Sequence, residues 1–490
     1  MTALMLFLWP LLSGLALLCL IKAPLKVVQW TNLALHLVWG VFVWKAWTDF
    51  VPGQMGTVSF SWNWFPSLGS SLALGIDGLS LPLIVLNFIL SFLLSFYSLG
   101  KEKLGATYLA LFSILNSGSV GSLLALDALA FYVFWEFMLI PMYFLIGKWG
   151  SKNRVYAALK FFAFTMAGSL LMLLAIIALG TEYQTLSWNA LRDAQIPYNG
   201  LGGFQGLVFL GFLVAFAVKI PVWPLHTWLP DAHTEAPTGA SVILAGVLLK
   251  LGVYGIARWG LALFPLAAQD VATVMMTLGA IGVVLGSFAA WKQTDIKRMI
   301  AYSSVAHLGF MVLGLFAFQE EALQGAMFQN LAHGLSTGAL FLIFGIIYDR
   351  THTREISQYG GLASKNGLLA TAFVFSAMAS IGLPGLPGFI GEFLILSGTF
   401  FTNKTIALVS LSCVLLGAVY MLSMLRKVVF GPVGPTLESH EIKLTWNEWV
   451  SVVPLLVLML ILGMQPQFLF EKSKFAVEWI MSLMASGWGV

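Results

Sequence analysis

The segment FQGLVFLGFLVAFAVKIPVWPL, residues 204–225, combines three features. It is long and apolar enough to cross a bilayer, which takes about 20 mainly apolar residues. It contains a lysine, Lys219, and two prolines, Pro221 and Pro224. Proline interrupts a helix, and inside a membrane such a break persists only where protein or a water-filled cavity satisfies the freed backbone groups. The segment therefore predicts a broken membrane helix with a buried charge.

The whole chain has the composition of an integral membrane protein. Of its 490 residues, 59% are hydrophobic and 9% are charged, against about 25% charged in an average soluble domain. The net charge of +4 is too small and too dispersed to suggest a nucleic-acid partner. The two cysteines, Cys19 and Cys413, lie far apart in apolar runs, which excludes a zinc site or an iron–sulfur cluster held by cysteines.

Fourteen segments have the length and composition of membrane helices, so we expect an all-α integral membrane protein with a single membrane domain, 1–490. The first apolar run lacks the basic start of a signal peptide and is counted as a helix. The segments are 3–21, 30–49, 78–99, 106–126, 128–147, 157–180, 204–225, 238–264, 271–291, 296–318, 323–348, 366–398, 405–429 and 448–470.

Basic residues predict the orientation. Sixteen of the 25 Lys and Arg residues fall in connections on one side of the membrane and four on the other. Basic connections face the cytoplasm, so both termini are expected on the non-cytoplasmic side. In the N-terminal unit, 1–99, residues 57–76 alternate small or polar with large apolar residues, which predicts an external β-hairpin. An interfacial loop anchored by Trp62 and Trp64 is an equally good interpretation.

A second interrupted helix suggests internal symmetry. Residues 366–398 contain the motif GLPGLPG with Pro384 and Pro387. Helices 4–8 (104–264) and 9–13 (271–430) form two five-helix blocks of opposite orientation, and helices 7 and 12 occupy the same place in their blocks. Paired breaks in two inverted repeats are typical of transporters. A last helix and a short tail, 448–490, follow the repeats.

Four ionisable residues lie well inside the predicted helices: Glu136, Lys219, Lys250 and Glu392. Each charge costs roughly 2.5–3.5 kcal/mol at the bilayer centre. Two acids and two bases could pair and be only structural. However, Lys219 and Glu392 lie beside the helix breaks, where water can enter, and a desolvated lysine exchanges its proton more readily. These residues indicate a conductor of protons or small cations.

Histidines extend the set of titratable groups. His307 and His333, in helices 10 and 11, titrate near neutral pH and are expected to tune proton transfer without being indispensable. Each could instead be only a helix–helix hydrogen-bond donor. One histidine per helix, with no second pair, argues against a b-type haem.

A polar cluster follows helix 7. His226, Asp231, His233 and Glu235 match no standard metal spacing, so we expect no metal site here and interpret the cluster as proton entry or as loop structure. Lys45 and Arg258 lie near outer helix ends and are expected to extend to the lipid headgroups.

Three segments resemble one known family. They are AFYVFWEFMLIP at 130–141, KIPVWPLHTWLPDAHTEAPT at 219–238 and DIKRMIAYSS at 295–304. They are similar to the antiporter-like membrane subunits of respiratory complex I, and the resemblance extends over residues 75–430. Glu392 stands where the sister L and N types typically carry lysine, which points to the M type.

The resemblance implies a proton-translocating membrane-arm subunit of an NADH:quinone oxidoreductase, with no redox site of its own. Flavin, iron–sulfur clusters, NADH and quinone are then expected elsewhere in the complex. The implied partners are other membrane subunits, with sister antiporter-like subunits on either side, and the bacterial inner membrane. The implied roles are a Glu136–Lys219 pair, a central relay at Lys250, an exit at Glu392, and a hydrated axis with His307 and His333.

Two related functions share these motifs. The chain could belong to a multi-subunit sodium/proton antiporter or to a membrane-bound hydrogenase. A membrane enzyme with its own chemistry has little support, because the sequence contains no phosphate-binding glycine loop and no nucleophile–base motif.

Overall fold

The computed structural model describes residues 1–486, apart from the side chains of Cys413 and Ser486, so the expectation for Cys413 lies outside the described residues. In this part of the chain, twelve helices are long and apolar enough to cross a membrane. Three further apolar helices are shorter: Phe204–Lys219, Gly367–Ser380 and Pro387–Thr402. The expected all-α membrane protein is confirmed.

Short connections join the elements, and two of the helical stretches, η2 and η3, are π-helical. The elements are α1 (Thr2–Cys19), α2 (Leu25–Asp49), β1 (Asn63–Phe65), η1 (Pro66–Leu68), β2 (Ser70–Ser71), α3 (Ser80–Ser98), α4 (Ala106–Leu124), α5 (Ala128–Phe137), α6 (Leu139–Trp149), α7 (Arg154–Tyr183), α8 (Trp188–Asp193), α9 (Phe204–Lys219), α10 (Trp228–Glu235), α11 (Thr238–Ile243), η2 (Leu244–Leu248), α12 (Leu249–Gly255), η3 (Ile256–Leu261), α13 (Pro265–Trp291), α14 (Ile296–Phe316), α15 (Glu320–Thr351), η4 (Ile356–Gln358), α16 (Leu362–Lys365), α17 (Gly367–Ser380), α18 (Pro387–Thr402), α19 (Lys404–Val428), α20 (Pro435–Ser439), α21 (Trp446–Met464) and α22 (Gln467–Ser486).

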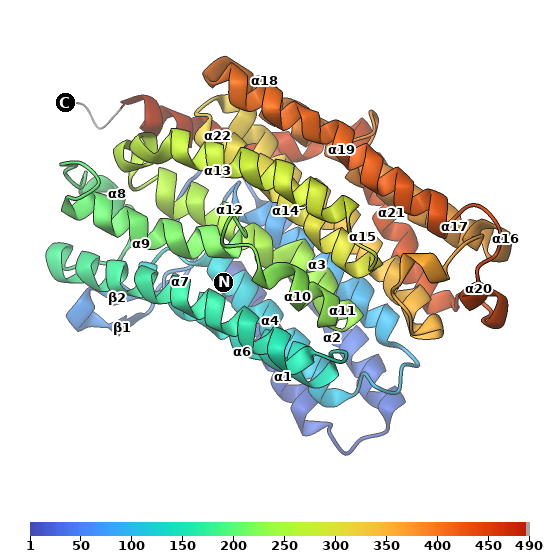
Figure 1. Cartoon of the computed structure of the whole chain (residues 1–490). Helices are drawn as coiled ribbons and strands as arrows, with labels where there is room; N and C mark the ends of the chain where they lie inside the picture. The colour runs from blue at the N-terminus through green and yellow to red at the C-terminus, as the bar shows by residue number, and fades with distance from the viewer. Residues whose placement is uncertain (487–490) are drawn as a thin grey trace.

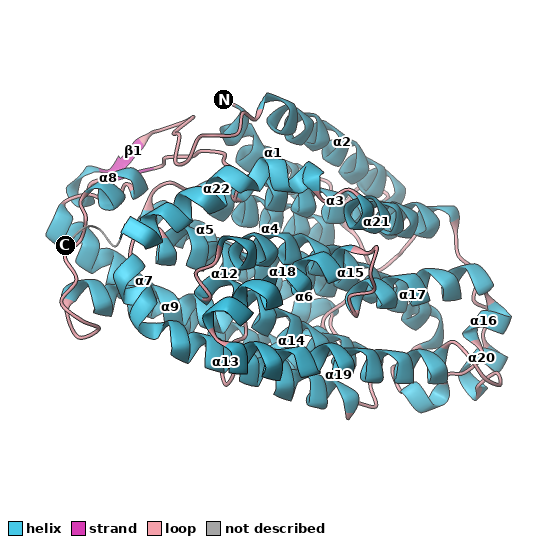
Figure 2. Ribbon diagram, turned by 90° about the horizontal axis from the view of Figure 1, so that it is seen from above, coloured by secondary structure: helices cyan, strands magenta, loops and turns pink. Residues whose placement is uncertain are grey.

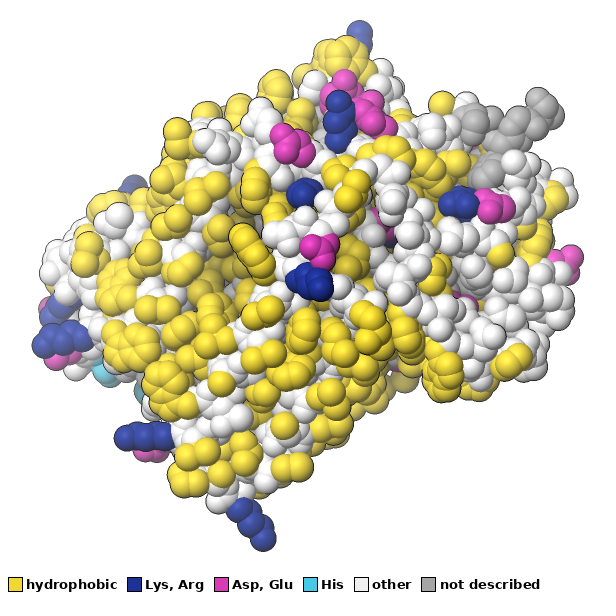
Figure 3. Space-filling model, turned by 180° about the vertical axis from the view of Figure 1, so that it is seen from behind, with side chains coloured by type: hydrophobic (Ala, Val, Ile, Leu, Met, Phe, Trp, Pro, Cys, Tyr) yellow, Lys and Arg dark blue, Asp and Glu magenta, His cyan; other side chains and the backbone are white. Residues whose placement is uncertain are grey.

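The long helices run side by side, and α15 lies in the middle of the bundle in two perpendicular views (Figures 1 and 2). The most extensively packed pairs are α13 with α14, α15 with α18, α1 with α4, and α7 with α9. Hydrophobic side chains are spread over the face shown in Figure 3, and the charged side chains on it are few. Such a surface suits a lipid environment, because an exposed apolar face of this extent is unfavourable in water.

A small hairpin connects α2 to α3. Strand β1 pairs antiparallel with β2, with Asn63 opposite Ser71. The pairing continues in an isolated bridge between Phe60 and Leu74. Ser70 donates a hydrogen bond of 2.8 Å to Asp127, the residue that caps α5. The hairpin is therefore attached to the start of the helix that carries Glu136.

Three helical features differ from the expectation. The fifth predicted helix is interrupted at Met138 and becomes α5 and α6. The eighth contains the two π-helical stretches, in which hydrogen bonds run from residue i to i+5 and an extra residue is accommodated per turn. Most of the expected C-terminal tail forms α22, in which Ser473 accepts a hydrogen bond of 2.7 Å from Gln324 and Trp479 packs on Trp188.

Candidate proton-transfer site

Lys219 is the last residue of α9, directly before the first helix break. Its side chain is 1% exposed, and its Nζ has no hydrogen-bond partner in the described part of the chain. The ammonium lies 5.1 Å from the ring centroid of Trp135 and 5.9 Å from that of Phe161. A cation over an aromatic face is stabilised by the ring quadrupole, but far less than by a carboxylate in direct contact. Lys219 is thus a buried cation that is only weakly held.

Glu136 follows Trp135 in α5 and is half-buried. It interacts electrostatically with Lys219. However, its Oε1 has no hydrogen-bond partner among the described residues, and the two side chains form no ion pair there. The expected Glu136–Lys219 pair stays a prediction, because the two charges act on each other without a direct ion pair among the described residues. Trp135, which precedes Glu136 on the same helix, offers its ring to the ammonium instead.

Lys250 lies in α12, just after the π-helical stretch η2, and is 1% exposed. Its Nζ donates to the Ala245 carbonyl at 2.6 Å and lies 2.5 Å from Nδ1 of His333 on α15. When the ammonium donates, Nδ1 must be unprotonated, which puts the proton of a neutral His333 on Nε2. The lysine and the histidine are thus in direct hydrogen-bonding contact.

A close backbone approach sets this contact. A Cβ added to Gly334, the residue after His333, would lie 2.9 Å from the carbonyl oxygen of Gly246 in η2 and 2.6 Å from the Leu86 side chain. Neither separation is tolerated by real Cβ atoms, so α15 and the π-helical stretch can come this close only with glycine.

His307 on α14 lies next to His333. Its ring centroid lies 5.4 Å from that of His333. Its Nδ1 lies 2.8 Å from Oε1 of Glu392 on α18, and Gln329 donates to the same oxygen at 3.3 Å. Lys250, His333, His307 and Glu392 therefore form one contiguous buried set, whereas Glu136 and Lys219 lie apart from it at the other break.

Each of the two helix breaks lies beside one buried charge, Glu392 at one break and Lys219 at the other. Between α17 and α18, the chain turns at Gly382, which has a φ of 76°, and Pro384 and Pro387 follow it. A Cβ at Gly382 would lie 2.9 Å from Oε2 of Glu392, so the turn folds back onto this carboxylate. Between α9 and α10, the segment that contains Pro221 and Pro224 ends the helix after Lys219. Both breaks occur where the prolines predict them.

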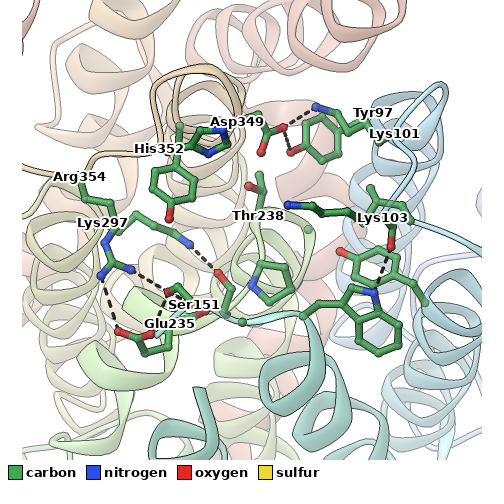
Figure 4. Close-up of a pocket in the computed structure, with 18 of the residues that line it drawn as sticks. Tyr97, Lys101, Lys103, Ser151, Glu235, Thr238, Lys297, Asp349, His352 and Arg354 are labelled. Atoms are coloured by element: carbon green, nitrogen blue, oxygen red, sulfur yellow. Dashed lines mark hydrogen bonds and ion pairs between the residues drawn. The ribbon is translucent and has the colours of Figure 1, made fainter. Parts of the chain in front are cut away.

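A cavity of about 610 Å³, here called the vestibule, opens near the N-terminus of α11. Figure 4 shows Tyr97, Lys101 and Asp349 on one side of it and Glu235 and Arg354 on the other. Asp349 accepts hydrogen bonds from Tyr97 and Lys101. The vestibule is thus lined by charges of both signs, which favours water.

Arg354 connects four segments at the vestibule. Its guanidinium pairs with Asp295 at 2.9 Å and with Glu235 at 3.6 Å, and donates to Ser151 Oγ at 3.0 Å and to the Thr234 carbonyl at 2.5 Å. Burial raises the pKa of the Asp295 carboxyl, and the charge of Arg354 opposes this shift. The network holds α10 against the connections after α6, α13 and α15.

Two buried groups lie between the vestibule and Lys250. Lys297 lines the vestibule and donates to the Ala236 carbonyl at 2.6 Å. His233 on α10 is fully buried, its ring stacks on Phe341 at 4.7 Å, and neither ring nitrogen has a partner in the described chain. His233 interacts electrostatically with both Lys297 and Lys250. The cluster after helix 7 therefore contributes a group between solvent and the central lysine.

Comparison with known proteins identifies the family. The family model described as "NADH:quinone oxidoreductase/Mrp antiporter, TM" matches residues 125–425. The chain belongs to this family. It is 44% identical over 413 residues to NADH-quinone oxidoreductase subunit M of Rhodobacter capsulatus, which covers 82% of this chain and 81% of that protein. It is 42% identical over 433 residues to subunit M of Escherichia coli (strain K12), covering 85% and 84%.

The fold agrees with this membership in the NADH:quinone oxidoreductase/Mrp antiporter family. A chain of "Respiratory complex I from Thermus thermophilus with bound NADH" superimposes with a TM-score of 0.90 at 29% identity, covering 99% of this chain and 100% of that chain. The family resemblance read from the motifs is confirmed.

The expected position of the Arg258 side chain was wrong. Arg258 does not extend to the headgroups: both it and Asp77 are 1% exposed, and the two form an ion pair. The guanidinium also lies 4.8 Å from the Trp188 ring centroid, and its Nε is 3.2 Å from the Tyr254 hydroxyl. Asp77 lies 181 residues away in sequence, in the connection before α3, so no local pattern could have indicated it.

The polar cluster after helix 7 is held by contacts within the protein. In the described residues, no group of three or more His, Cys, Asp or Glu side chains is arranged to hold a metal ion. Glu235 instead accepts from Ser151 Oγ at 2.8 Å and from the Asn153 backbone at 2.9 Å.

Proposed function

We propose that this chain is a proton-translocating membrane-arm subunit of a redox-driven NADH:quinone oxidoreductase. The observation that carries the proposal is the contiguous buried set Lys250–His333–His307–Glu392. All four groups can gain and lose a proton, and they lie on helices from both halves of the chain. The curated relatives of similar length are named as subunits of such an enzyme.

The proposed topology has fourteen crossings. The twelve long spans supply twelve of them. The interrupted segments 204–225, which contains α9, and 366–398, which contains α17 and α18, supply the other two, as helices 7 and 12. On this count, residues 104–264 and 271–430 are inverted five-helix repeats, and both termini lie on the non-cytoplasmic side of the bacterial inner membrane. The excess of basic residues in alternate connections supports this orientation.

The proposed transfer moves one proton at a time along the buried set. Lys250 gives a proton to Nδ1 of His333, which then releases its Nε2 proton towards His307. Imidazole suits this step because one ring nitrogen accepts while the other donates. The ring centroids are 5.4 Å apart, so a water molecule between the two rings completes the step. His307 passes its Nδ1 proton to Glu392, 2.8 Å away.

Protons enter from the cytoplasm through the vestibule. Lys297 and His233 lie between this cavity and Lys250 and interact with each other electrostatically. Protons leave from Glu392 through the break between α17 and α18, where Gly382 folds onto its carboxylate.

The weakly held Lys219 is the second proton-exchanging group, and its charge depends on Glu136. When a neighbouring subunit draws Glu136 away, Lys219 loses its nearest counter-charge and releases a proton more readily. Lysine suits this role because arginine would remain charged. Flavin, iron–sulfur clusters, NADH and quinone belong to other subunits, and sister antiporter-like subunits flank this chain on either side.

Purification and reconstitution test the proposal. A complex that contains this chain should carry flavin and iron–sulfur proteins and, in sealed vesicles, should move protons when NADH reduces a quinone, with or without sodium. Purification with small membrane partners alone, and sodium-dependent exchange, would favour an antiporter subunit. Hydrogen-dependent reduction would favour a hydrogenase subunit.

A further inference from the structure

A second set of buried polar side chains lies among α1 to α4, outside the proposed proton path. On α3, Asn87, Ser91 and Ser95 follow one another at about one-turn spacing, and on α2 Asn32 and His36 do the same. All five are buried. Asn87 lies 11 residues before the end of α3. At 1.5 Å per residue this is about 16 Å, which is half the thickness of a bilayer core of about 30 Å.

Several polar atoms in this set have no partner. Ser91 Oγ lies 2.9 Å from Asn116 Oδ1 and 3.4 Å from Asn87 Oδ1. The amide nitrogens of Asn87 and Asn116 and the hydroxyl of Ser113 have no hydrogen-bond partner within residues 1–486. A buried polar group without a partner costs about 1–3 kcal/mol. Lipid tails cannot supply one, so these groups need another source of hydrogen bonds.

Two small cavities lie beside these atoms. The first, of about 20 Å³, has as its polar lining Asn32, His36, Ser91, Ser95, Tyr97 and Tyr108. The second, of about 10 Å³, has as its polar lining Trp9, Ser13, His36, Trp39, Ser113 and Asn116. Tyr97 and Tyr108 also line the vestibule, and His36 lines both small cavities. A water needs about 10–15 Å³ and 2–4 polar partners, and both cavities meet these conditions approximately.

An apolar wall separates this set from the central lysine. Leu86 and Leu90 lie on another face of α3, where a Cβ on Gly334 would meet Leu86 and a Cβ on Gly246 would meet Leu90. Both leucines are buried. The polar residues Asn87 and Ser91 and the leucines that meet the Lys250–His333 region therefore lie on different faces of α3.

We propose that the cluster among α1–α4 is an internal water-binding site that opens at the vestibule and ends at Asn87 and Asn116. The bound waters supply the hydrogen bonds that the two amides and Ser113 lack in the protein. They also give His36 contact with solvent that bypasses Lys250 and His333. The titratable groups at the mouth include Tyr97, Tyr108, Lys101 and Asp349. The site does not depend on the proposed proton path.

Radiolytic hydroxyl-radical labelling of the intact complex in lipid nanodiscs tests the site, because bound water produces radicals in place. Trp39 lines the second cavity and is 2% exposed. Trp188 is a matched control: it is 0% exposed, lines neither cavity, and like Trp39 donates its indole N–H to a backbone carbonyl. We expect Trp39 to be oxidised several-fold faster than Trp188. Equal rates would overturn the proposal.

Substitutions of Asn116 and Ser113, which line the second cavity, test where the water binds. Asn116→Leu removes polar atoms at similar volume and should lower Trp39 oxidation to the Trp188 rate, and Ser113→Ala should lower it in part. Ser122→Ala is the control, since that hydroxyl bonds the Gly118 carbonyl of its own helix. Unchanged Trp39 oxidation in assembled complexes with Asn116→Leu and with Ser113→Ala would also overturn the site. Glu392→Gln should leave this labelling unchanged, so a failure of the proposed proton path remains distinguishable.

Discussion

His307 and Glu392 lie 85 residues apart and share a contact of 2.8 Å between Nδ1 and Oε1. The contact joins α14 to α18, the second half of an interrupted helix. A carboxylate that accepts from a neutral imidazole becomes a stronger acceptor when the imidazole is protonated. In the proposed path, arrival of a proton at His307 would therefore strengthen its hydrogen bond to Glu392 before transfer.

Replacing Glu392 by Gln should abolish proton pumping while leaving assembly intact. Glutamine keeps the volume and the hydrogen bonds but cannot carry a proton, so we expect a loss of at least about 100-fold, as for other essential acid–base groups. The measurement is protons moved per electron pair in reconstituted vesicles. Gln329→Leu, which removes the 3.3 Å hydrogen bond to the same carboxylate, should retain most of the activity. Full pumping by Glu392→Gln would rule out this exit.

Replacing Lys219 by Arg should be nearly as damaging as replacing it by Met, because arginine keeps the charge and does not release its proton. Lys160→Arg is the matched control, since Lys160 on α7 is held by Asp231 at 2.7 Å. Glu136→Gln should also stop pumping, whereas Glu136→Asp should retain part of it. Quinone reduction should fall together with pumping. Normal pumping by an assembled Glu136→Gln, Lys219→Met double variant would make these charges structural.

Replacing His333 by alanine and by leucine should have different effects on turnover. Alanine leaves room for a water molecule next to Lys250, so His333→Ala should slow turnover in part. Leucine fills the space with an apolar group, so His333→Leu should reduce turnover much further. The comparison uses NADH oxidation rates of equally assembled complexes. If both variants turn over like the unaltered protein, the histidine only connects helices.

The Arg258–Asp77 pair should behave as a structural clamp. Removing one partner leaves a buried charge uncompensated, which costs about 3–5 kcal/mol. Arg258→Met or Asp77→Leu alone should therefore lower the thermal stability of the chain in the solubilised complex. The double variant should recover most of it, because an apolar pair replaces an ion pair at little cost. Single variants as stable as the unaltered protein would show that the pair contributes little.

A reporter that is active only in the cytoplasm should be inactive when fused after Val490. The same reporter inserted between Lys101 and Lys103 should be active, because that basic connection is expected on the cytoplasmic side. Activity at the C-terminus would remove one crossing from the proposed topology.

Local sequence signals were sufficient to predict the membrane spans and the two helix breaks. The apolar spans, the breaks beside Lys219 and Glu392, and the buried charges follow from hydropathy and proline chemistry, which act within one helix. The division of the fifth helix at Met138 and the π-helical stretches were not predictable. They depend on packing between helices, and their residues look like those of any apolar helix.

Partnerships across the chain were the least predictable feature. Lys250 and His333 are 83 residues apart, and each was identified as a candidate, but nothing in the sequence indicates their contact. In the sequence, Arg258 lies near a helix end, where a long basic side chain can reach the lipid headgroups. Its burial depends on an ion pair with Asp77, which is distant in sequence. The polar residues of α1–α4 were missed because single Asn and Ser residues in membrane helices carry no charge to draw attention.

Gly334 packs closely against Gly246, so the backbones of α15 and η2 set how far apart Lys250 and His333 lie. Side-chain rotations in the surrounding leucines can change the lining of the membrane interior without lengthening this gap. Sequence drift should therefore be tolerated widely around Lys250 and His333 and very little at Gly334, where one added methyl group would press on the Gly246 carbonyl and force the helices apart.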